Sequence, residues 1–172
     1  MSPSPFVVEW ALRTASDLPP GAPRALDVAA GRGRHVAALA AAGFRVFGVD
    51  RSFEVLRDAV TMTRAEGGWL RAWCADLTTY PLVADAFDLV LVTRYLQRDL
   101  FPSLRRTVTR GGFVIYETFT RRQLRYDWGP RSPDHLLEPG ELLSYFLDFD
   151  VIFYEERDEP EAVARLVARR LS

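Results

Sequence analysis

The amino-acid sequence predicts a single α/β domain built on a mostly parallel sheet. Short apolar stretches typical of strands alternate with longer segments of helical periodicity, which is the pattern of α/β folds. The length of 172 residues suits one domain, and 48% of the residues are hydrophobic, which is enough for a core. Residues 87–93 (FDLVLVT) form an unbroken apolar run, as expected for a central strand with both faces covered.

Capping and breaking residues place the elements of the first half of the chain. Ser52 can cap a helix, whereas Gly43 and the pair 67–68 end helices. The expected elements are a helix over 6–18, a strand over 25–29 with a glycine turn over 31–33, a helix over 35–42, a strand over 45–50, a helix over 52–66 and a strand over 69–74.

The second half continues the alternation and then becomes irregular. The expected elements are a strand over 87–93, a helix over 99–109, a turn at 111–112, a strand over 113–119, a helix starting at Pro139 and strands over 150–155 and 162–169. The last of these alternates imperfectly, so a helix stays open there. Residues 120–137 have no clear period and three helix breakers, which predicts a long loop that acts as a lid on the substrate side.

Composition excludes several classes of protein. One cysteine and two histidines exclude a disulfide framework and a metal site rich in thiolates or histidines, so we expect no metal. All 22 basic residues are Arg against 23 acidic residues, and a net charge of -1 disfavours a nucleic-acid partner. The sequence lacks a long apolar run and a basic leader, so we expect a cytoplasmic protein without membrane contact. Cys74 lies in an apolar strand and is expected in the core.

Three successive strand ends carry residues suited to a nucleotide. The first strand runs into Gly31 and Gly33, which let the backbone approach a ligand at a helix N-terminus. Asp50 ends the second strand, where a carboxylate can accept both ribose hydroxyls, and Asp76 follows the third, where it can accept from an adenine amine. A bare tight turn and simple helix or loop caps are the alternatives. Val36 replaces the third glycine of the dinucleotide fingerprint, which disfavours an NAD(P)-dependent oxidoreductase.

These segments together resemble class I S-adenosylmethionine-dependent methyltransferases. The matching pieces within 24–119 are LDVAAGRGRH, VFGVDRS, ADL, FDLVLVTRYL and TRGGFVIYETF, and the later PDHLLEPGELL is similar to the small-molecule branch that includes tellurite-resistance-type methyltransferases. The resemblance implies a Rossmann-like methyltransferase fold with helices on both faces of a seven-stranded sheet, in the order 3-2-1-4-5-7-6 with an antiparallel last strand. Motif IV lacks the proline pair of nucleic-acid amino-methyltransferases.

The resemblance also implies S-adenosyl-L-methionine as cofactor and S-adenosyl-L-homocysteine as product. The residues that it assigns to the cofactor are Asp27, Ala29, Gly31, Gly33, Asp50, Arg51, Asp76, Leu77, Thr93 and Arg94. Ala30, Arg110 and Gln97 depart from the usual pattern, and Gln97 stands where a histidine is frequent, which removes one possible base. His35 is expected beside the loop or the cofactor carboxylate rather than as a base.

The acceptor side is less constrained. Methyl transfer is an in-line displacement in which positioning supplies much of the catalysis. Catalytic candidates are Arg94, Tyr95, Glu117 and His135, and candidates for substrate binding are Arg98, Thr118, Tyr126 and Arg131; each is alternatively a solvated or capping residue. Residues 94–131 hold nine Arg against three acids, whereas 132–172 hold ten acids against four Arg. The basic stretch predicts a small anionic acceptor, a carboxylate or an oxyanion.

Two further expectations concern the lid and the protein as a whole. Tyr126 and Trp128 in the lid, with Phe6 and Trp10 in the first helix, are expected to close over the ligands, with plain packing the favoured alternative for Trp10. The protein is expected to act as an enzyme on a small molecule, as a monomer or homodimer. The alternative is a non-catalytic S-adenosylmethionine-binding regulator or partner protein, which the missing base keeps open.

Overall fold

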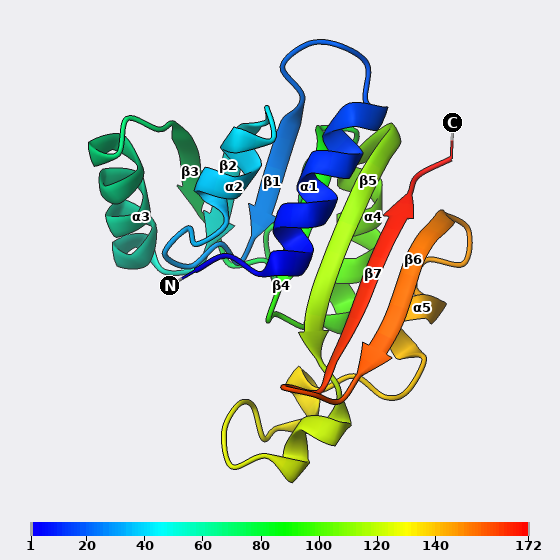
Figure 1. Cartoon of the computed structure of the whole chain (residues 1–172). Coiled ribbons are helices and arrows are strands. Elements are labelled where there is room, and N and C mark those ends of the chain that lie inside the picture. The colour runs from blue at the N-terminus through cyan, green and yellow to red at the C-terminus, as the bar shows by residue number, and fades with distance from the viewer. Residues whose placement is uncertain (1, 172) are drawn as a thin grey trace.

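The computed structural model describes residues 2–171 and contains one seven-stranded sheet (Figure 1). Its order is β3-β2-β1-β4-β5-β7-β6, and β7 runs antiparallel to both of its neighbours, β5 and β6, which confirms the predicted topology. The strands are β1 (Arg24–Val28), β2 (Arg45–Asp50), β3 (Leu70–Cys74), β4 (Phe87–Thr93), β5 (Val108–Phe119), β6 (Asp150–Arg157) and β7 (Val163–Arg169). The segment 162–169, left open between strand and helix, is therefore mostly strand β7.

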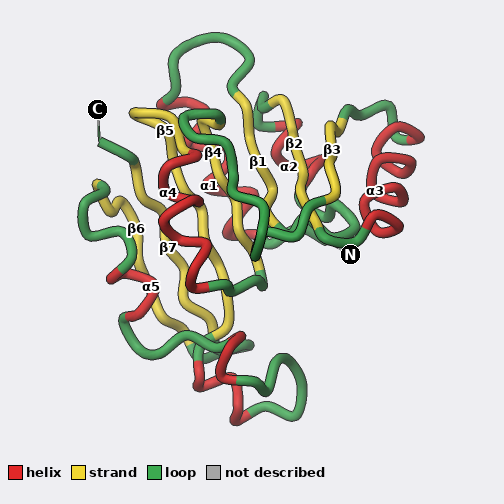
Figure 2. The backbone as a smooth tube through the Cα atoms, turned by 180° about the vertical axis from the view of Figure 1, so that it is seen from behind, coloured by secondary structure: helices red, strands yellow, loops and turns green. Residues whose placement is uncertain are grey.

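Helices cover both faces of the sheet (Figures 1 and 2). They are α1 (Pro5–Asp17), α2 (Val36–Ala41), α3 (Phe53–Ala65), α4 (Phe101–Thr107) and α5 (Glu141–Ser144), with 3₁₀ turns η1 (Arg98–Leu100), η2 (Arg121–Arg125) and η3 (Pro133–His135). Side chains of α1 and α2 share one buried cluster with β1, β2 and β4, and side chains of α4 and α5 share a second on the opposite face.

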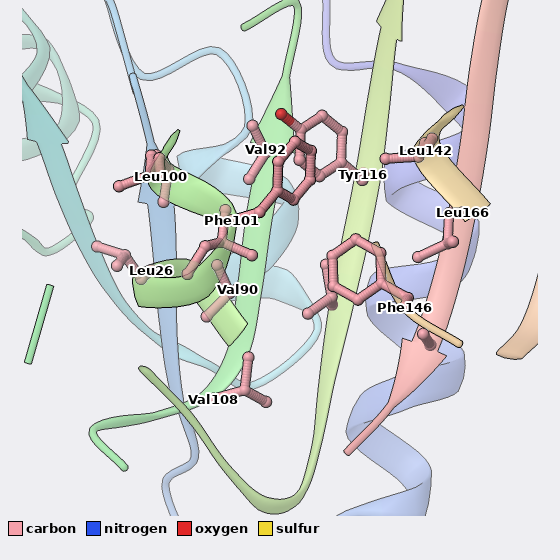
Figure 3. Packing of buried hydrophobic residues seen from close by; sticks show 14 of the residues in the cluster. Leu26, Val90, Val92, Leu100, Phe101, Val108, Tyr116, Leu142, Phe146 and Leu166 are labelled. Atoms are coloured by element: carbon pink, nitrogen blue, oxygen red, sulfur yellow. The ribbon is translucent and has the colours of Figure 1, made fainter. Parts of the chain in front are cut away.

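Strand β4 explains why its sequence shows no polar alternation. Leu89 and Leu91 belong to the cluster under α1 and α2, whereas Val90 and Val92 belong to the cluster under α4. All four are fully buried, because each face of this central strand meets helices. Figure 3 shows the second cluster, in which the ring of Phe101 stacks on that of Tyr116 with centroids 5.5 Å apart. Each such side chain contributes about 1.5–3 kcal/mol by leaving water.

The predicted helix over 99–109 is wrong at both ends. It begins as the 3₁₀ turn η1, and the α-helix stops at Thr107 because the chain enters β5 at Val108. The expected turn at 111–112 lies inside β5 instead, where the pairing with β4 shifts register. A Cβ on Gly112 would approach the Asp88 carbonyl oxygen to 2.8 Å, so this glycine allows the close approach of the strands.

The exposure of three side chains tests further expectations from the sequence, and it corrects those for Cys74 and Phe6. Cys74 is exposed rather than in the core, because it ends the edge strand β3, whose last residues are only partly covered. Phe6 does not close over a ligand: it is buried in the cluster under α1, with its ring 5.7 Å from that of Phe153. Trp10 packs beside it, as its alternative predicted.

Candidate functional site

A cavity of about 400 Å³ opens at the carboxyl edge of the sheet. The strand order reverses between β1 and β4, and ligands of open α/β sheets bind at such switch points. Residues that follow β1 to β5, together with two from the segment 120–137, line the cavity: Ala29, Asp50, Arg51, Ala75, Asp76, Leu77, Thr78, Arg94, Tyr95, Leu96, Phe119, Pro130 and His135. The fold thus brings eight predicted site residues to one cavity: Ala29, Asp50, Arg51, Asp76, Leu77, Arg94, Tyr95 and His135.

The turn after β1 is held in a left-handed backbone. Ala29, Gly31 and Gly33 have φ angles of 54°, 54° and 72°, and a non-glycine residue in this region carries strain of about 1–2 kcal/mol. A Cβ on Gly33 would lie 3.0 Å from Val36 Cγ2 and 3.3 Å from Ala59 Cβ. Gly33 is thus required both by its backbone angle and by the close packing of α2 and α3.

Asp50 fixes this turn through its carboxylate. Oδ2 accepts from the Gly31 amide at 2.9 Å, and Oδ1 accepts from the Ser52 amide at 3.0 Å. Each oxygen keeps a further lone pair toward the cavity that Asp50 lines. Ser52 caps α3, as predicted, by accepting from the Val55 amide.

Asp76 and Leu77 form the far wall of the cavity. Asp76 Oδ1 accepts from both the amide and the hydroxyl of Thr78, and these bonds lower the pKa of Asp76. The Leu77 carbonyl accepts from Gln97 Nε2 at 3.2 Å, and the Tyr95 hydroxyl donates to Gln97 Oε1. Gln97 therefore joins the two strand ends, a role that its amide suits because it donates and accepts at once.

Asp27 and His35 form a buried pair beneath the glycine turn, outside the cavity lining. His35 Nδ1 lies 3.9 Å from Asp27 Oδ2, and that oxygen has no hydrogen bond with residues 2–171. Burial raises the pKa of Asp27 to about 7, although Arg34 works to lower it. His35 Nε2 accepts from the Ser4 amide at 3.4 Å, and burial followed by the charges of Arg34 and Arg94 lowers its pKa to about 3. His35 thus joins the start of α1 to β1.

Arg34, which the sequence arguments missed, lies in reach of the same charges. Its pKa is lowered by desolvation and by Arg94, against the opposing effect of Glu117, Asp27 and Glu161. Arg34 directly follows Gly33 in the sequence, and this position could have identified it as a site residue. The turn and the start of the next helix lie at the edge of the sheet where ligands bind.

The remaining predicted residues lie away from the cavity surface. Thr93 is largely buried at the end of β4, Thr118 is buried in β5, and Glu117 Oε2 accepts from Arg165 Nε at 2.6 Å. Tyr126 donates its hydroxyl to the Asp158 carbonyl, and Arg131 donates to the Leu124 carbonyl at 3.0 Å. Gly31, Gly33, Asp27 and Arg98 likewise do not line the cavity.

The arginine-rich stretch is largely neutralised by the acidic tail. Five ion pairs join them: Arg94–Glu161, Arg98–Glu141, Arg105–Asp148, Arg121–Glu138 and Arg122–Asp158, with Arg125 on the same Asp158. The basic stretch 94–131 and the acidic stretch 132–172 therefore contact each other in the folded protein. Most of the guanidinium groups of the basic stretch bind carboxylates of the acidic one.

The segment 120–137 packs on the end of β5 through buried contacts. Gln123 is fully buried, accepts from the Ala162 amide at 2.9 Å and donates to the Trp128 carbonyl at 3.0 Å. The Trp128 ring stands edge-on to Phe119 with centroids 6.1 Å apart. Sequence arguments missed Gln123, because a polar residue in an irregular segment gives no burial signal.

The described residues contain neither a metal-binding cluster nor a membrane-spanning helix. Within residues 2–171 no cluster of three or more His, Cys, Asp or Glu side chains has the arrangement of a metal site. No helix in the same range combines the length and apolar character needed to cross a bilayer.

Solved structures share this architecture. TehB from Haemophilus influenzae superposes with a TM-score of 0.73 at 17% identity over 94% of this chain, which spans only 62% of TehB. An S-adenosylmethionine-dependent methyltransferase from Mesorhizobium loti gives a TM-score of 0.70 at 22% identity, covering 95% of this chain and 98% of that one. One from Methanosarcina mazei gives 0.73 at 16% identity over 99% of both chains.

Sequence comparison adds the family. No curated protein sequence matches the chain. A family model described as a methyltransferase domain matches residues 25–112, just over half of the chain, from β1 to the middle of β5. The matched range contains the glycine turn, Asp50, Asp76 and Arg94, which surround the cavity or fix its wall. The chain belongs to the methyltransferase domain family.

Proposed function

We propose that this enzyme transfers a methyl group from S-adenosylmethionine to a small anionic acceptor, a carboxylate or an oxyanion. The observation that carries the proposal is the Arg94 side chain. It lines the cavity, and only its Nη2 is hydrogen-bonded within residues 2–171, to Glu161 at 2.9 Å. Nε and Nη1 remain as donors on two different edges of the guanidinium plane, and either can donate to an anion.

The residues around the cavity fit the cofactor. Asp50 keeps lone pairs for the ribose hydroxyls, and Asp76 with the Leu77 amide stands at the wall where the adenine is expected. The glycine turn and Asp27 lie at the carboxyl end of β1, at the same edge of the sheet as Arg51 and Thr93, which stand at the ends of β2 and β4. Asp27 Oδ2 is a buried acceptor without a donor among residues 2–171. The ammonium group of the cofactor could supply this missing donor.

When bound, the cofactor supplies a methyl group on a sulfonium, which a nucleophile displaces in line. An anionic acceptor attacks without losing a proton, so the protein needs to orient the acceptor rather than deprotonate it. Two of the candidate bases are already committed within the protein, which supports this division. The Tyr95 hydroxyl is committed to Gln97, and burial raises its pKa further. Glu117 is committed to Arg165.

Local backbone geometry fixes the direction of Arg94. Its φ of 53° is left-handed, and its amide donates to the Glu117 carbonyl at 2.8 Å, which ties it to β5. The guanidinium carbon lies 5.4 Å from the centre of the Phe119 ring, another cavity residue. Glu161 on one side and Phe119 on the other hold the group in place, which favours its use as an anion contact.

The size and charge of the protein support a small molecule as acceptor. A cavity of about 400 Å³ lies toward the small end of ligand sites, and the cofactor must share it. The net charge of -1 and the internal pairing of the arginines disfavour a nucleic acid. We propose His135, which also lines the cavity, as a second contact to the acceptor.

Methyl transfer to a panel of acceptors tests the proposal. Purified protein is incubated with S-adenosylmethionine carrying a labelled methyl group and with small carboxylates, oxyanions, amines and neutral phenols. We expect turnover with anionic members only, reduced at least tenfold by Arg94→Ala and unchanged by Arg122→Ala, whose ion pair lies away from the cavity. Turnover of neutral acceptors, or of anions at the same rate in Arg94→Ala, overturns the proposal.

A further inference from the structure

Arg98 binds the protein itself with all three nitrogens of its guanidinium group. Nε and Nη2 donate to the two carboxylate oxygens of Glu141 at 2.6 and 2.9 Å, a bidentate pair. Nη2 also donates to the Leu136 carbonyl at 3.0 Å, and Nη1 donates to the carbonyls of Pro133 and Asp134 at 3.5 and 3.4 Å. A substrate would have to break one of these bonds to engage Arg98.

The three carbonyl groups belong to η3 and to Leu136, the residue directly after it, and the Pro133 carbonyl also accepts from the Leu136 amide. The end of a helical turn leaves carbonyl oxygens without amide partners, and a planar side chain with five N–H groups can satisfy several of them. At the next residue, the Leu137 amide donates to the Phe119 carbonyl at 2.9 Å and the Leu137 carbonyl accepts from the Arg121 amide. The segment is therefore held by β5 on one side and by Arg98 on the other.

Glu141 makes the hold rigid. Its Oε2 also accepts from the Glu138 amide at 2.8 Å, and its Oε1 accepts from the Tyr145 hydroxyl at 3.2 Å. The Glu141 side chain is only 15% exposed. Desolvation acts to raise its pKa, but the bond from Arg98 and that from the Glu138 amide outweigh it, so the pKa of Glu141 lies below its usual value.

The position of this pair links it to the cavity. Arg98 begins η1, three residues after Tyr95, which lines the cavity from the end of β4. His135 lies inside the clamped turn and lines the same cavity. Any outward movement of η3 must break the bonds to Arg98.

We propose that Arg98, braced by Glu141, is a positioning residue that fixes the η3 turn to the end of β4 and so holds His135 at the acceptor side of the cavity. The inference rests on the proposed function, because it takes this wall as the acceptor side. It also predicts which part of the segment 120–137 is fixed, namely its C-terminal third.

The two histidines make the proposal measurable by nuclear magnetic resonance. His35 is buried, and its lowered pKa of about 3 keeps it uncharged near neutral pH, so it serves as an internal fold reference. The His135 ring resonances report on η3. We expect S-adenosylhomocysteine to shift the His135 resonances in the native protein, and Arg98→Leu to reduce that shift at least twofold while leaving His35 unchanged.

Matched variants separate positioning from folding. Arg122→Leu removes another arginine–carboxylate pair from the segment 120–137 and should behave as the native protein. Arg98→Lys keeps the charge but loses the planar fork, so it replaces Arg98→Leu if the latter unfolds, and it should recover only part of the shift. A broad-specificity protease should cleave within 120–137 at least threefold faster in Arg98→Leu and in Glu141→Gln.

The outcomes distinguish the two proposals. If His135 does not respond to S-adenosylhomocysteine in a native protein that binds it, or if a folded Arg98 variant keeps the full shift and the native cleavage rate, the positioning role is wrong. If the native protein does not bind S-adenosylhomocysteine, the proposed function fails, whereas faster cleavage in the Arg98 variants and displaced His135 resonances without ligand still support the clamp.

Discussion

Replacing Asp27 by asparagine should change how the stability of the protein depends on pH. Asp27 and His35 are both 1% exposed and lie 3.9 Å apart, yet burial moves their pKa values in opposite directions. The pKa of Asp27 rises from an ordinary 3.8 to about 7, and that of His35 falls from 6.5 to about 3. Asn keeps the shape of the side chain and removes its titration.

The sign of each effect follows from which state binds the proton. Between pH 3.8 and about 7, folded Asp27 holds a proton that the unfolded chain has lost, so its stabilisation is full below 3.8 and is lost as pH rises through about 7. Below pH 6.5 His35 binds a proton in the unfolded chain but stays uncharged in the folded protein down to about pH 3. Its contribution to the free energy of unfolding is therefore lost as pH falls. The two slopes oppose each other between pH 4 and 6.5.

The size of the effect follows from the pKa shift. A rise of about three pKa units, at about 1.4 kcal/mol for each unit, corresponds to about 4 kcal/mol. Asp27 is fully buried, so no discount for solvent screening applies. Relative to the native protein, Asp27→Asn should therefore gain about 4 kcal/mol in free energy of unfolding between pH 4 and pH 8.

Denaturant unfolding followed by circular dichroism at five pH values from 4 to 8 measures this difference. Asp17→Asn, the same substitution at an exposed carboxylate at the end of α1, serves as the control. A difference between Asp27→Asn and the native protein that is flat with pH, or that falls as pH rises, would refute the reasoning.

Three further changes test the cavity and its edge. Asp50→Ala should weaken S-adenosylhomocysteine binding by on the order of 2–4 kcal/mol in calorimetry, because it removes the ribose contacts and frees the Gly31 amide; undiminished affinity would mean that another acid holds the ribose. Gly33→Ala should lower the free energy of unfolding by about 1–2 kcal/mol, because of its left-handed backbone and the contact at 3.0 Å; an unchanged denaturation midpoint would contradict this. Cys74 should react with Ellman's reagent in the folded protein, since it is exposed, and a thiol that reacts only after unfolding would show that it is covered.

Local pattern and resemblance together predicted most of the sheet. The apolar run of β4 and the glycine turn after β1 depend on residues that are close in sequence. Both could therefore be predicted from the residue types alone. Strand order came from the resemblance. The boundary between α4 and β5 was missed because Thr107 to Gly112 is shaped by the bulged pairing with β4, a contact between distant segments.

The pairing of charges was also beyond local reasoning. The excess of arginine over 94–131 indicated an anion site, but Arg98 and Arg121 meet carboxylates 43 and 17 residues away. Distant pairs of this kind depend on the tertiary fold, and composition alone does not distinguish an arginine that binds a ligand from one that binds the protein. Arg94 differs from these because it combines an ion pair with a place in the cavity lining.

Calorimetric titration of the protein with S-adenosylhomocysteine and, separately, with NAD tests the nucleotide site most directly. We expect S-adenosylhomocysteine to bind with one molecule per chain and NAD to give no binding heat, because Asp50 and Asp76 stand at successive strand ends and Val36 replaces the third dinucleotide glycine. Absence of binding to S-adenosylhomocysteine, or tight binding of NAD, would contradict the assignment of the cavity.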